Sequence, residues 1–452
     1  MSKLISRNYM LIECEVSSLL TKNMKKGVTV AGIISCAAIF VYLLFIAHAV
    51  ISTSLVHRIN ERRYFNKSFE VLHKFDRERG FDLSRRLPKL STNSYLENDG
   101  KELSRGDLDQ NKRENATLLM LVRNWELEGA LKSMRSLEDR FNRNYNYDWT
   151  FLNDVPFDDA FIEATSAMAS GNTYYGLIPS SDWDKPSFID EEELESNLQL
   201  MQEKGVIYGG SKSYRNMCRF NSGFFFRQTL LDKYQYYFRV EPEVEYYCDF
   251  PYDPFEVMRK QRKKYGFVIS MYEYEDTIPT LWDAVEEFMA DQPEMVDFDT
   301  NSYDFITDDS MIGLEMPIIQ SNSNYNLCHF WSNFEIGDLS FFRSEKYLKF
   351  FEHLDKKKGF YLERWGDAPV HSIAVALLLR QDEIIHFDEL GYYHIPFGTC
   401  PSAHNIRLQQ RCICDPNAES NIDVKAHSCL ARWWKSGGGK YFMKHKSSST
   451  GT

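Results

Sequence analysis

The chain has 452 residues, of which 43% are hydrophobic and 15% aromatic, so it can bury a large core as one big domain or two smaller ones. Its formal net charge is -12 at pH 7. Proteins that bind nucleic acids normally present a basic surface to the phosphates, and we therefore exclude DNA and RNA as partners.

The first element in chain order is an apolar segment at residues 27–51, GVTVAGIISCAAIFVYLLFIAHAVI, which contains no charged side chain. It is long enough for a helix that crosses a bilayer, which needs ~20 apolar residues. A cleaved signal peptide is the alternative, but its apolar core is only ~7–15 residues long, and here it would follow a polar lead. We therefore predict a cytoplasmic tail over residues 1–26 and an uncleaved transmembrane anchor over residues 27–51.

Charge does not decide the orientation of this anchor, because basic residues stand on both sides of it, for example Lys26 before it and Arg58 after it. Two N-glycosylation sequons follow the anchor, at Asn66 and Asn115. They would be modified only if the rest of the chain is luminal. The sequons thus favour a single-pass protein whose C-terminal part lies in the lumen.

Seven of the nine cysteines follow the anchor: Cys218, Cys248, Cys328, Cys400, Cys412, Cys414 and Cys429. In an oxidising lumen they would form up to three disulfides and leave one thiol free. A zinc site is the alternative, because four of them cluster near the C-terminal end. Their spacing lacks the paired C-x-x-C units of common zinc modules, which favours disulfides.

A polar, charge-rich segment at residues 52–115 shows little apolar periodicity and is predicted to be a stem. From Ala116 onwards, ATLLMLVRN predicts a buried strand, WELEGALKSMRSLEDRFNR an amphipathic helix, and DWTFLND a second buried strand. This order indicates a parallel α/β unit. Ligands of such units bind at the carboxyl ends of the strands, here marked by Arg123 and Asp154, although polar residues also end strands that bind nothing.

Two further elements and one acidic segment follow. YGFVIS at residues 265–270 predicts a strand, and TIPTLWDAVEEFMA at residues 277–290 predicts a helix with Pro279 in an early position. The acidic stretch at residues 296–316 lacks the spacing of an EF-hand, so we predict a solvated, irregular loop.

A first candidate for chemistry is RVEPE, in which Glu241 and Glu243 are two positions apart. On an extended chain both carboxylates would point to one face, and oxygen ligands of this kind suit Mg²⁺ or Mn²⁺. The polar face of an edge strand would look the same. Asp249 and Asp253 are reserve ligands.

Four further acids and histidines, in three segments of the chain, stand in apolar or aromatic surroundings. Glu335 in SNFEIGD is either a buried, tuned acid or an exposed turn residue. Asp367 and His371 would share one face of a helix as a catalytic pair, or Asp367 would simply cap that helix. His394 in YYHIPF is either a ligand or a core residue.

Seven blocks in fixed order resemble the fungal α-1,2-mannosyltransferases of glycosyltransferase family 15: LVRNWEL, FLNDVPF, YGGSKSYRNMCRFNSGFFFR, RVEPEVEYYCDFPYDPF, YNLCHFWSNFEIGDL, GFYLERWGDAPVHS and GYYHIPFGTCP. The resemblance covers roughly residues 118–414. It implies a Golgi type II membrane protein with a luminal GT-A-like α/β domain built on a central mixed, Rossmann-like sheet. We place this domain at residues 116–440 and a C-terminal tail at residues 441–452.

The resemblance also implies a reaction and roles for individual residues. The enzyme would use GDP-mannose and Mn²⁺ to extend O- and N-linked glycans of mannoproteins. The implied metal ligands are Glu241 and His394; Glu335 matches the acid proposed as nucleophile; Tyr214 and Arg219 would line the donor–acceptor cleft; Asp367 would orient the acceptor and Arg123 bind the nucleotide. Glu243 stands where many relatives carry Asp, and we count it with the substrate-binding residues.

An α-linked donor and an α-linked product imply that the anomeric configuration is retained. Either Glu335 attacks the anomeric carbon, or the acceptor enters from the side of the leaving group while Glu335 stabilises an oxocarbenium-like state. Two other functions remain open on the sequence alone: transfer of mannose-1-phosphate from the same donor, and a non-catalytic, lectin-like Golgi subunit.

Overall fold

The computed structural model describes residues 113–308, 321–423 and 425–438, all of which fall in one compact unit, Lys67–Thr452. Several predicted segments lie outside the described residues: the cytoplasmic tail at residues 1–26, the anchor at residues 27–51, the sequon at Asn66, nearly all of the stem, and the C-terminal tail at residues 441–452. No helix in the described part of the chain is long and apolar enough to cross a membrane. The domain boundaries given above remain predictions.

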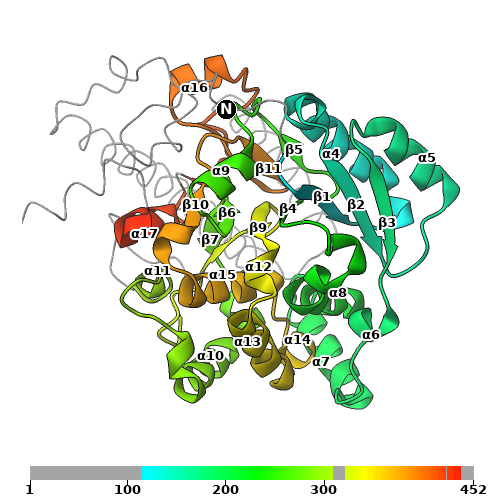
Figure 1. The fold of residues 1–452 in the computed structure, drawn as a ribbon. Coiled ribbons are helices and arrows are strands. Elements are labelled where there is room, and N and C mark those ends of the chain that lie inside the picture. The colour runs from blue at the N-terminus through cyan, green and yellow to red at the C-terminus, as the bar shows by residue number, and fades with distance from the viewer. Residues whose placement is uncertain (1–112, 309–320, 424, 439–452) are drawn as a thin grey trace, which may run out of the picture. The chain divides into compact units, whose positions relative to one another are not determined.

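A seven-stranded sheet forms the centre of the described unit, with strand order β10-β6-β9-β4-β1-β2-β3 (Figure 1). All neighbouring strands are parallel except β9, which runs antiparallel to both β6 and β4. The strands are β1 Ala116–Leu121, β2 Asp148–Asn153, β3 Thr173–Leu177, β4 Tyr236–Arg239, β6 Tyr265–Phe267, β9 Glu335–Asp338 and β10 Ile384–His386. The mixed α/β fold with a central mixed sheet that we predicted is confirmed.

Two apolar layers cover the sheet, because successive side chains of a strand point to opposite faces. Leu118 and Met120 of β1 pack into one layer and Leu119 into the other. Figure 1 shows α4 and α5 on the first face, and α8, α13 and α15 on the second. The first layer includes α4 Leu127–Arg140, α5 Asp159–Met168 and α9 Pro254–Lys260.

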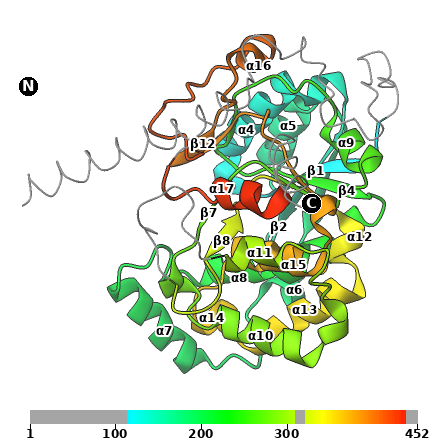
Figure 2. The same cartoon turned by 90° about the vertical axis from the view of Figure 1, so that its left-hand side faces the viewer.

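The second layer is larger and contains most of the remaining helices, whose packing Figure 2 shows from the side. They are α6 Ser180–Trp183, α7 Glu191–Glu203, α8 Lys212–Gly223, α10 Leu281–Asp291, α11 Tyr303–Thr307, α12 Leu339–Phe342, α13 Glu345–Lys356, α14 Gly359–Leu362, α15 Asp367–Leu378 and α17 Leu430–Trp433. Of these, α15 is buried at every position except Ala368, since it lies between the sheet and the helices around it.

The predicted unit of strand, helix and strand at the start of the domain is confirmed. β1 pairs with β2 in parallel, with Leu119 opposite Thr150. Between them α4 buries Ala130, Met134 and Leu137, whose spacing places them on one face of the helix. The carboxyl ends of β1, β2 and β4 therefore lie together at one edge of the sheet.

Two small sheets and three disulfides fix the C-terminal segment. The strands are β5 Glu245–Tyr246, β11 Tyr392–His394 and β12 Phe397–Thr399 in one sheet, and β7 Ser270–Tyr272 and β8 Cys328–Phe330 in the other; the helix α16 covers His404–Gln409. The disulfides join Cys248 to Cys412, Cys328 to Cys429 and Cys400 to Cys414, and Cys218 is a free, buried thiol. The predicted three disulfides and single thiol are confirmed.

Several local predictions need correction. YGFVIS is not one strand: β6 belongs to the central sheet and β7 pairs with β8, so the chain changes sheets at Val268 and Ile269. The helix after TIPT begins at Leu281, so Pro279 precedes it. The acidic stretch is not irregular throughout, because α11 forms within it and buries Phe305 and Ile306, while residues 309–316 lie outside the described residues.

Candidate active site

A cavity of about 330 Å³ lies at the carboxyl ends of β1 and β4. Its lining includes Arg123 after β1, Tyr214 and Asn221 from α8, Glu241 after β4, and Glu335 at the start of β9. A cavity at this edge is where a parallel-rich α/β sheet places its ligand. Four of the predicted site residues line this cavity, namely Arg123, Tyr214, Glu241 and Glu335, whereas Arg219, Glu243, Asp367 and His394 do not.

Arg123 lines the cavity and is held by four neighbouring side chains. Its guanidinium pairs with the carboxylate of Asp154, which follows β2 as the sequence predicted, and donates to Ser213 Oγ over 3.1 Å. The same group packs over the ring of Trp183 at 4.8 Å and over that of Trp125 at 5.7 Å. A fixed cation flanked by aromatic rings suits a planar base with a phosphate attached.

Tyr214 lines the same cavity, from the first turn of α8. Ser211 caps the helix by accepting from the Tyr214 backbone, and the Tyr214 ring stacks on Tyr208 at 4.6 Å. Arg364 donates to the phenol oxygen over 3.2 Å. Burial raises the pKa of Tyr214 well above its usual value, so the phenol keeps its proton.

Arg219 does not line the cavity, although the sequence placed it there with Tyr214. It is five residues further along α8, which corresponds to a rotation of roughly 140° about the helix axis, so it points to another face. Its guanidinium binds both carboxylate oxygens of Asp355 over 2.7 and 2.8 Å, and it is 6% exposed. Arg219 joins α8 to α13.

Glu241 and His394 meet at the rim of the cavity, with Glu241 Oε2 3.4 Å from His394 Nε2. The pairing of β11 with β5 brings them together. The other ring nitrogen, Nδ1, lies 2.9 Å from the Ile395 carbonyl, which can only accept, so Nδ1 carries a proton and Nε2 is the nitrogen that faces Glu241. Both side chains keep about a quarter of their surface exposed.

These two groups fit a divalent cation. Burial lowers the pKa of His394, but Glu241 outweighs it and raises that pKa, so a proton on Nε2 stabilises the contact with the carboxylate. A divalent cation can take the place of this proton between the carboxylate oxygen and the imidazole nitrogen. Two ligands bound to one ion at ~2.1 Å each lie at most ~4.2 Å apart, and the observed separation satisfies this limit. Burial raises the pKa of Glu241, but Arg239 and His394 outweigh it and hold that pKa at about 2, so Glu241 is ionised.

The other carboxylates of this segment lie elsewhere. The chain turns after β4, and Glu243 has a left-handed φ of 63°, so Glu241 and Glu243 do not share the face of a strand and Glu243 does not line the cavity. Asp249 pairs with Arg140 over 2.8 Å. Asp253 accepts from Tyr147 and caps α9. The predicted extended pair and its reserve ligands are therefore not assembled.

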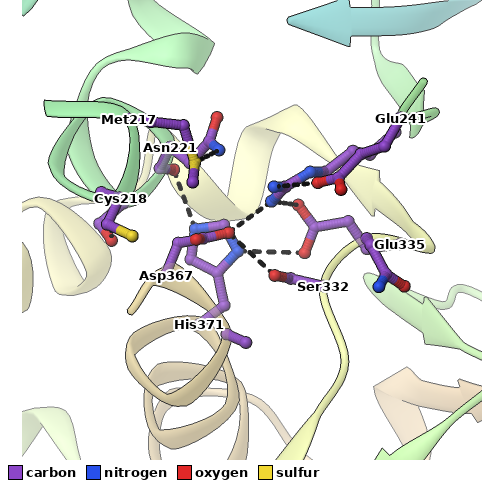
Figure 3. Close-up of polar contacts among 12 residues, drawn as sticks. Met217, Cys218, Asn221, Glu241, Ser332, Glu335, Asp367 and His371 are labelled. Atoms are coloured by element: carbon purple, nitrogen blue, oxygen red, sulfur yellow. Dashed lines mark hydrogen bonds and ion pairs between the residues drawn. The ribbon is translucent and has the colours of Figure 1, made fainter. Parts of the chain in front are cut away.

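Glu335 is buried, with only 1% of its surface exposed, and accepts hydrogen bonds at both oxygens. Tyr237 donates to Oε1 over 2.8 Å, and Tyr265 donates to Oε2 over 2.9 Å. Oε2 also lies 3.0 Å from His371 Nδ1 (Figure 3). The alternative of an exposed turn residue is wrong, because β9 is inserted between β4 and β6 and carries this side chain into the interior.

Arg239, which the sequence argument missed, connects the acids of the site. Nη1 donates to Asp367 Oδ2 over 2.5 Å and Nη2 to Glu241 Oε1 over 2.6 Å, while Glu335 Oε1 is 3.9 Å from Nη1. Arg239 and Glu241 are two positions apart where β4 ends, a spacing that offered a signal. A planar guanidinium can hold several carboxylates in fixed positions at once.

Asp367 is the first residue of α15, and its carboxylate does not cap the helix, whose N-cap is Gly366. Ser332 donates to it over 2.8 Å in addition to Arg239. Burial raises the pKa of Asp367, but Arg239 and His371 together hold it below the usual range. The predicted pair of Asp367 and His371 does share one buried face of α15, yet His371 contacts Glu335 rather than Asp367 (Figure 3).

The sequence and the fold both match one family. The family model described as glycolipid 2-alpha-mannosyltransferase matches residues 82–438. The chain belongs to this family. It is accordingly an enzyme, a mannosyltransferase.

Individual relatives are similar over most of their length. The probable mannosyltransferase KTR2 of Saccharomyces cerevisiae is 66% identical over 385 residues, which cover 85% of this chain and 90% of that protein. The alpha-1,2 mannosyltransferase KTR1 of the same yeast is 49% identical, over 71% of this chain and 78% of its own. The predicted family is therefore confirmed.

A solved structure shows the same fold. Core-mannan synthase A of Aspergillus fumigatus, in its Mn/GDP form, has a TM-score of 0.67 and 38% identity over 73% of this chain and 86% of its own. This protein and core-mannan synthase A thus share one mixed α/β fold.

Proposed function

We propose that this mannosyltransferase moves mannose from GDP-mannose to a mannoside with retention of the α configuration, forming an α-1,2 linkage with the help of Mn²⁺. The names of similar proteins support this proposal: KTR1 is an alpha-1,2 mannosyltransferase, and core-mannan synthase A was solved in an Mn/GDP form. The observation that carries it is the meeting of two metal-ligating groups and a buried carboxylate at one cavity.

Glu241 and His394 would hold the Mn²⁺ ion, which neutralises negative charge on the departing diphosphate. Arg123 binds the nucleotide, since its guanidinium is fixed by Asp154 and framed by two indole rings. Arg239 keeps Glu241 at the rim of the cavity and in the ionised form that a metal ligand requires.

Glu335 presents one oxygen to the donor sugar. Oε2 already receives Tyr265 and faces His371, so both of its lone pairs are engaged, whereas Oε1 receives one hydrogen bond, from Tyr237. Glu335 lines the cavity, and Oε1 is the atom with a lone pair to spare. Oε1 therefore either attacks the anomeric carbon or stabilises positive charge there.

We place the acceptor between Glu335 and the mouth of the cavity. Asp367 is ionised and bound to Arg239 and Ser332, but it does not line the cavity, so we propose that it orients the acceptor by holding Arg239, which does. Tyr214 lines the cavity, keeps its phenol proton and can donate to a sugar oxygen. Arg239 and Tyr214 together fix the acceptor relative to the donor sugar.

The purified full-length chain, incubated with GDP-mannose, Mn²⁺ and a panel of mannosides, tests the proposal. We expect an α-1,2-linked product with the mass of one added mannose, and no product in the presence of a chelator. An added mass that includes phosphate would show transfer of mannose-1-phosphate instead. Absence of donor turnover with every mannoside and with mannoprotein would overturn the proposal in favour of a lectin-like subunit.

We further propose that the enzyme acts in the Golgi, anchored by residues 27–51 with its catalytic part in the lumen, on O- and N-linked glycans of mannoproteins. The disulfides support an oxidising compartment. Asn115 is exposed, and its side chain donates to the Lys233 carbonyl over 2.7 Å. Glycans on Asn66 or Asn115, detected by a mobility shift after glycosidase treatment, would place the catalytic part in the lumen. Sequons without glycans, in a protein found outside the Golgi, would refute the assignment.

A further inference from the structure

His371 is a buried polar group to which neither the family resemblance nor the sequence alone gave a settled role. It lies on α15, is 0% exposed, and is enclosed by aromatic rings of Phe225, Phe342 and Tyr347. Its Nδ1 is 3.0 Å from Glu335 Oε2 and its Nε2 is 3.0 Å from the backbone oxygen of Asn221 (Figure 3). Each ring nitrogen thus faces an oxygen.

The positions of the protons follow from these two contacts. A backbone carbonyl oxygen only accepts, so Nε2 carries a proton and donates it to Asn221. One proton must also lie between Nδ1 and Oε2, because two bare lone pairs 3.0 Å apart in a buried site would be strongly unfavourable. The pair is therefore either an imidazolium with a carboxylate or a neutral imidazole with a carboxylic acid.

The surrounding groups favour the state in which His371 is an imidazolium and Glu335 a carboxylate. Glu335 accepts from the phenols of Tyr237 and Tyr265 and lies 3.9 Å from the guanidinium of Arg239, all of which stabilise an anion. The ionised Asp367, one turn before His371 on α15, stabilises a cation on the ring. The other groups around the ring, on α8, α12 and α13, are the Asn221 carbonyl, Phe342 and the neutral phenol of Tyr347.

We infer that His371 is a positioning residue that, as an imidazolium, fixes Oε2 of Glu335 and so leaves Oε1 as the oxygen turned to the donor sugar. The inference rests on the proposed function of Glu335. His371 also ties Glu335 to α8 through Asn221, which itself lines the cavity. The orientation of the reacting carboxylate and the wall of the cavity are thereby held by one side chain.

The kinetic test compares two neighbouring substitutions on α15. His371→Gln removes the cation and one of its two donors, and we expect kcat to fall about 10- to 100-fold while the KM for GDP-mannose stays unchanged. Ser372→Ala is the matched control, because Ser372 is equally buried but bonds only to the backbone of Ala368 and Phe330. It should lower the melting temperature and leave kcat unchanged.

Wild-type kcat in folded His371→Gln would overturn the inference, as would an equal fall in kcat for both variants. Wild-type turnover of GDP-mannose reports separately on the proposed function, and the ratio of variant to wild type reports on His371. The rates of the two variants therefore distinguish failure of the inference from failure of the function.

A second measurement does not depend on enzyme activity, so it needs neither a substrate nor an active His371 variant. In nitrogen-15 NMR of histidine-labelled protein, the ring assigned to His371 should carry protons on both nitrogens at neutral pH. In Glu335→Gln the neutral amide no longer requires a cation, so we expect that ring to lose its Nδ1 proton. A His371 ring with one bare nitrogen in the wild-type protein, or a ring that stays doubly protonated in Glu335→Gln, would contradict the assignment.

Discussion

The strongest test of the site's architecture is the removal of the charge on Arg239. Its guanidinium side chain is 11% exposed and binds Asp367, which is 7% exposed, and Glu241, which is 27% exposed. Arg239→Gln would leave the carboxylate of Asp367 buried with Ser332 as its remaining close donor. Breaking a buried pair in this way costs about 3–5 kcal/mol of unfolding free energy. Glu241 adds less, because its exposed surface lets water replace the lost partner.

The second substitution Asp367→Asn turns this cost into a sharper prediction. Removing both charges of a buried pair leaves no uncompensated ion, so Arg239→Gln/Asp367→Asn should recover most of the stability lost in Arg239→Gln. Unfolding followed by tryptophan fluorescence measures all three proteins. If the unfolding free energy of Arg239→Gln lies within ~1 kcal/mol of wild type, which is the contribution of an exposed ion pair, the reasoning is refuted. A double variant less stable than the single one would do the same.

Three further predictions concern the acids and the nucleotide site. Glu335→Gln and Glu241→Ala should each abolish nearly all mannose transfer with the fold intact by circular dichroism, and Glu241→Ala should also lose Mn²⁺ binding; near-normal transfer by either variant would remove its assigned role. Arg123→Lys keeps the charge but loses the planar contacts, so the Kd for GDP, measured by calorimetry, should rise about 10- to 100-fold, and an unchanged Kd would place the nucleotide elsewhere. Burial raises the pKa of Asp253 to about 7 from an ordinary value of about 4, so the folded state holds an extra proton between these values and stability falls as pH rises from about 4 to 7. Asp253→Asn should lack this fall. If the melting temperature changes equally in the two proteins between pH 5.5 and pH 8, the prediction is contradicted.

The start of the domain could be predicted because its signals are local. The apolar run at Ala116–Leu121 and the spacing of Ala130, Met134 and Leu137 each fix one element within a few turns of chain. The position of β9 could not be predicted in this way. Its register pairs Glu335 with Arg239 on one side and with Phe267 on the other, and no local pattern encodes partners about 70 to 100 residues away.

The metal site also depends on long-range strand pairing that no local pattern encodes. Spacing paired Glu241 with Glu243, and this failed because the chain turns at Glu243. The ligand that does face Glu241 is His394, which the resemblance supplied and which the pairing of β11 with β5 brings across about 150 residues. A ligand set assembled from separate small strands leaves no trace in the spacing of either segment.

The charges of the assembled site explain why these distant segments must meet. Glu241, Glu335 and Asp367 are three acids joined by Arg239, and with His371 as a second cation the cluster carries one net negative charge. A donor with a diphosphate would be repelled by that charge, whereas a divalent cation on Glu241 and His394 reverses its sign. His371 contacts Glu335 and Ser332 contacts Asp367, so each of these acids has a partner of its own besides the shared Arg239. Metal binding at Glu241 therefore need not draw Glu335 or Asp367 out of position, although Arg239 joins all three acids.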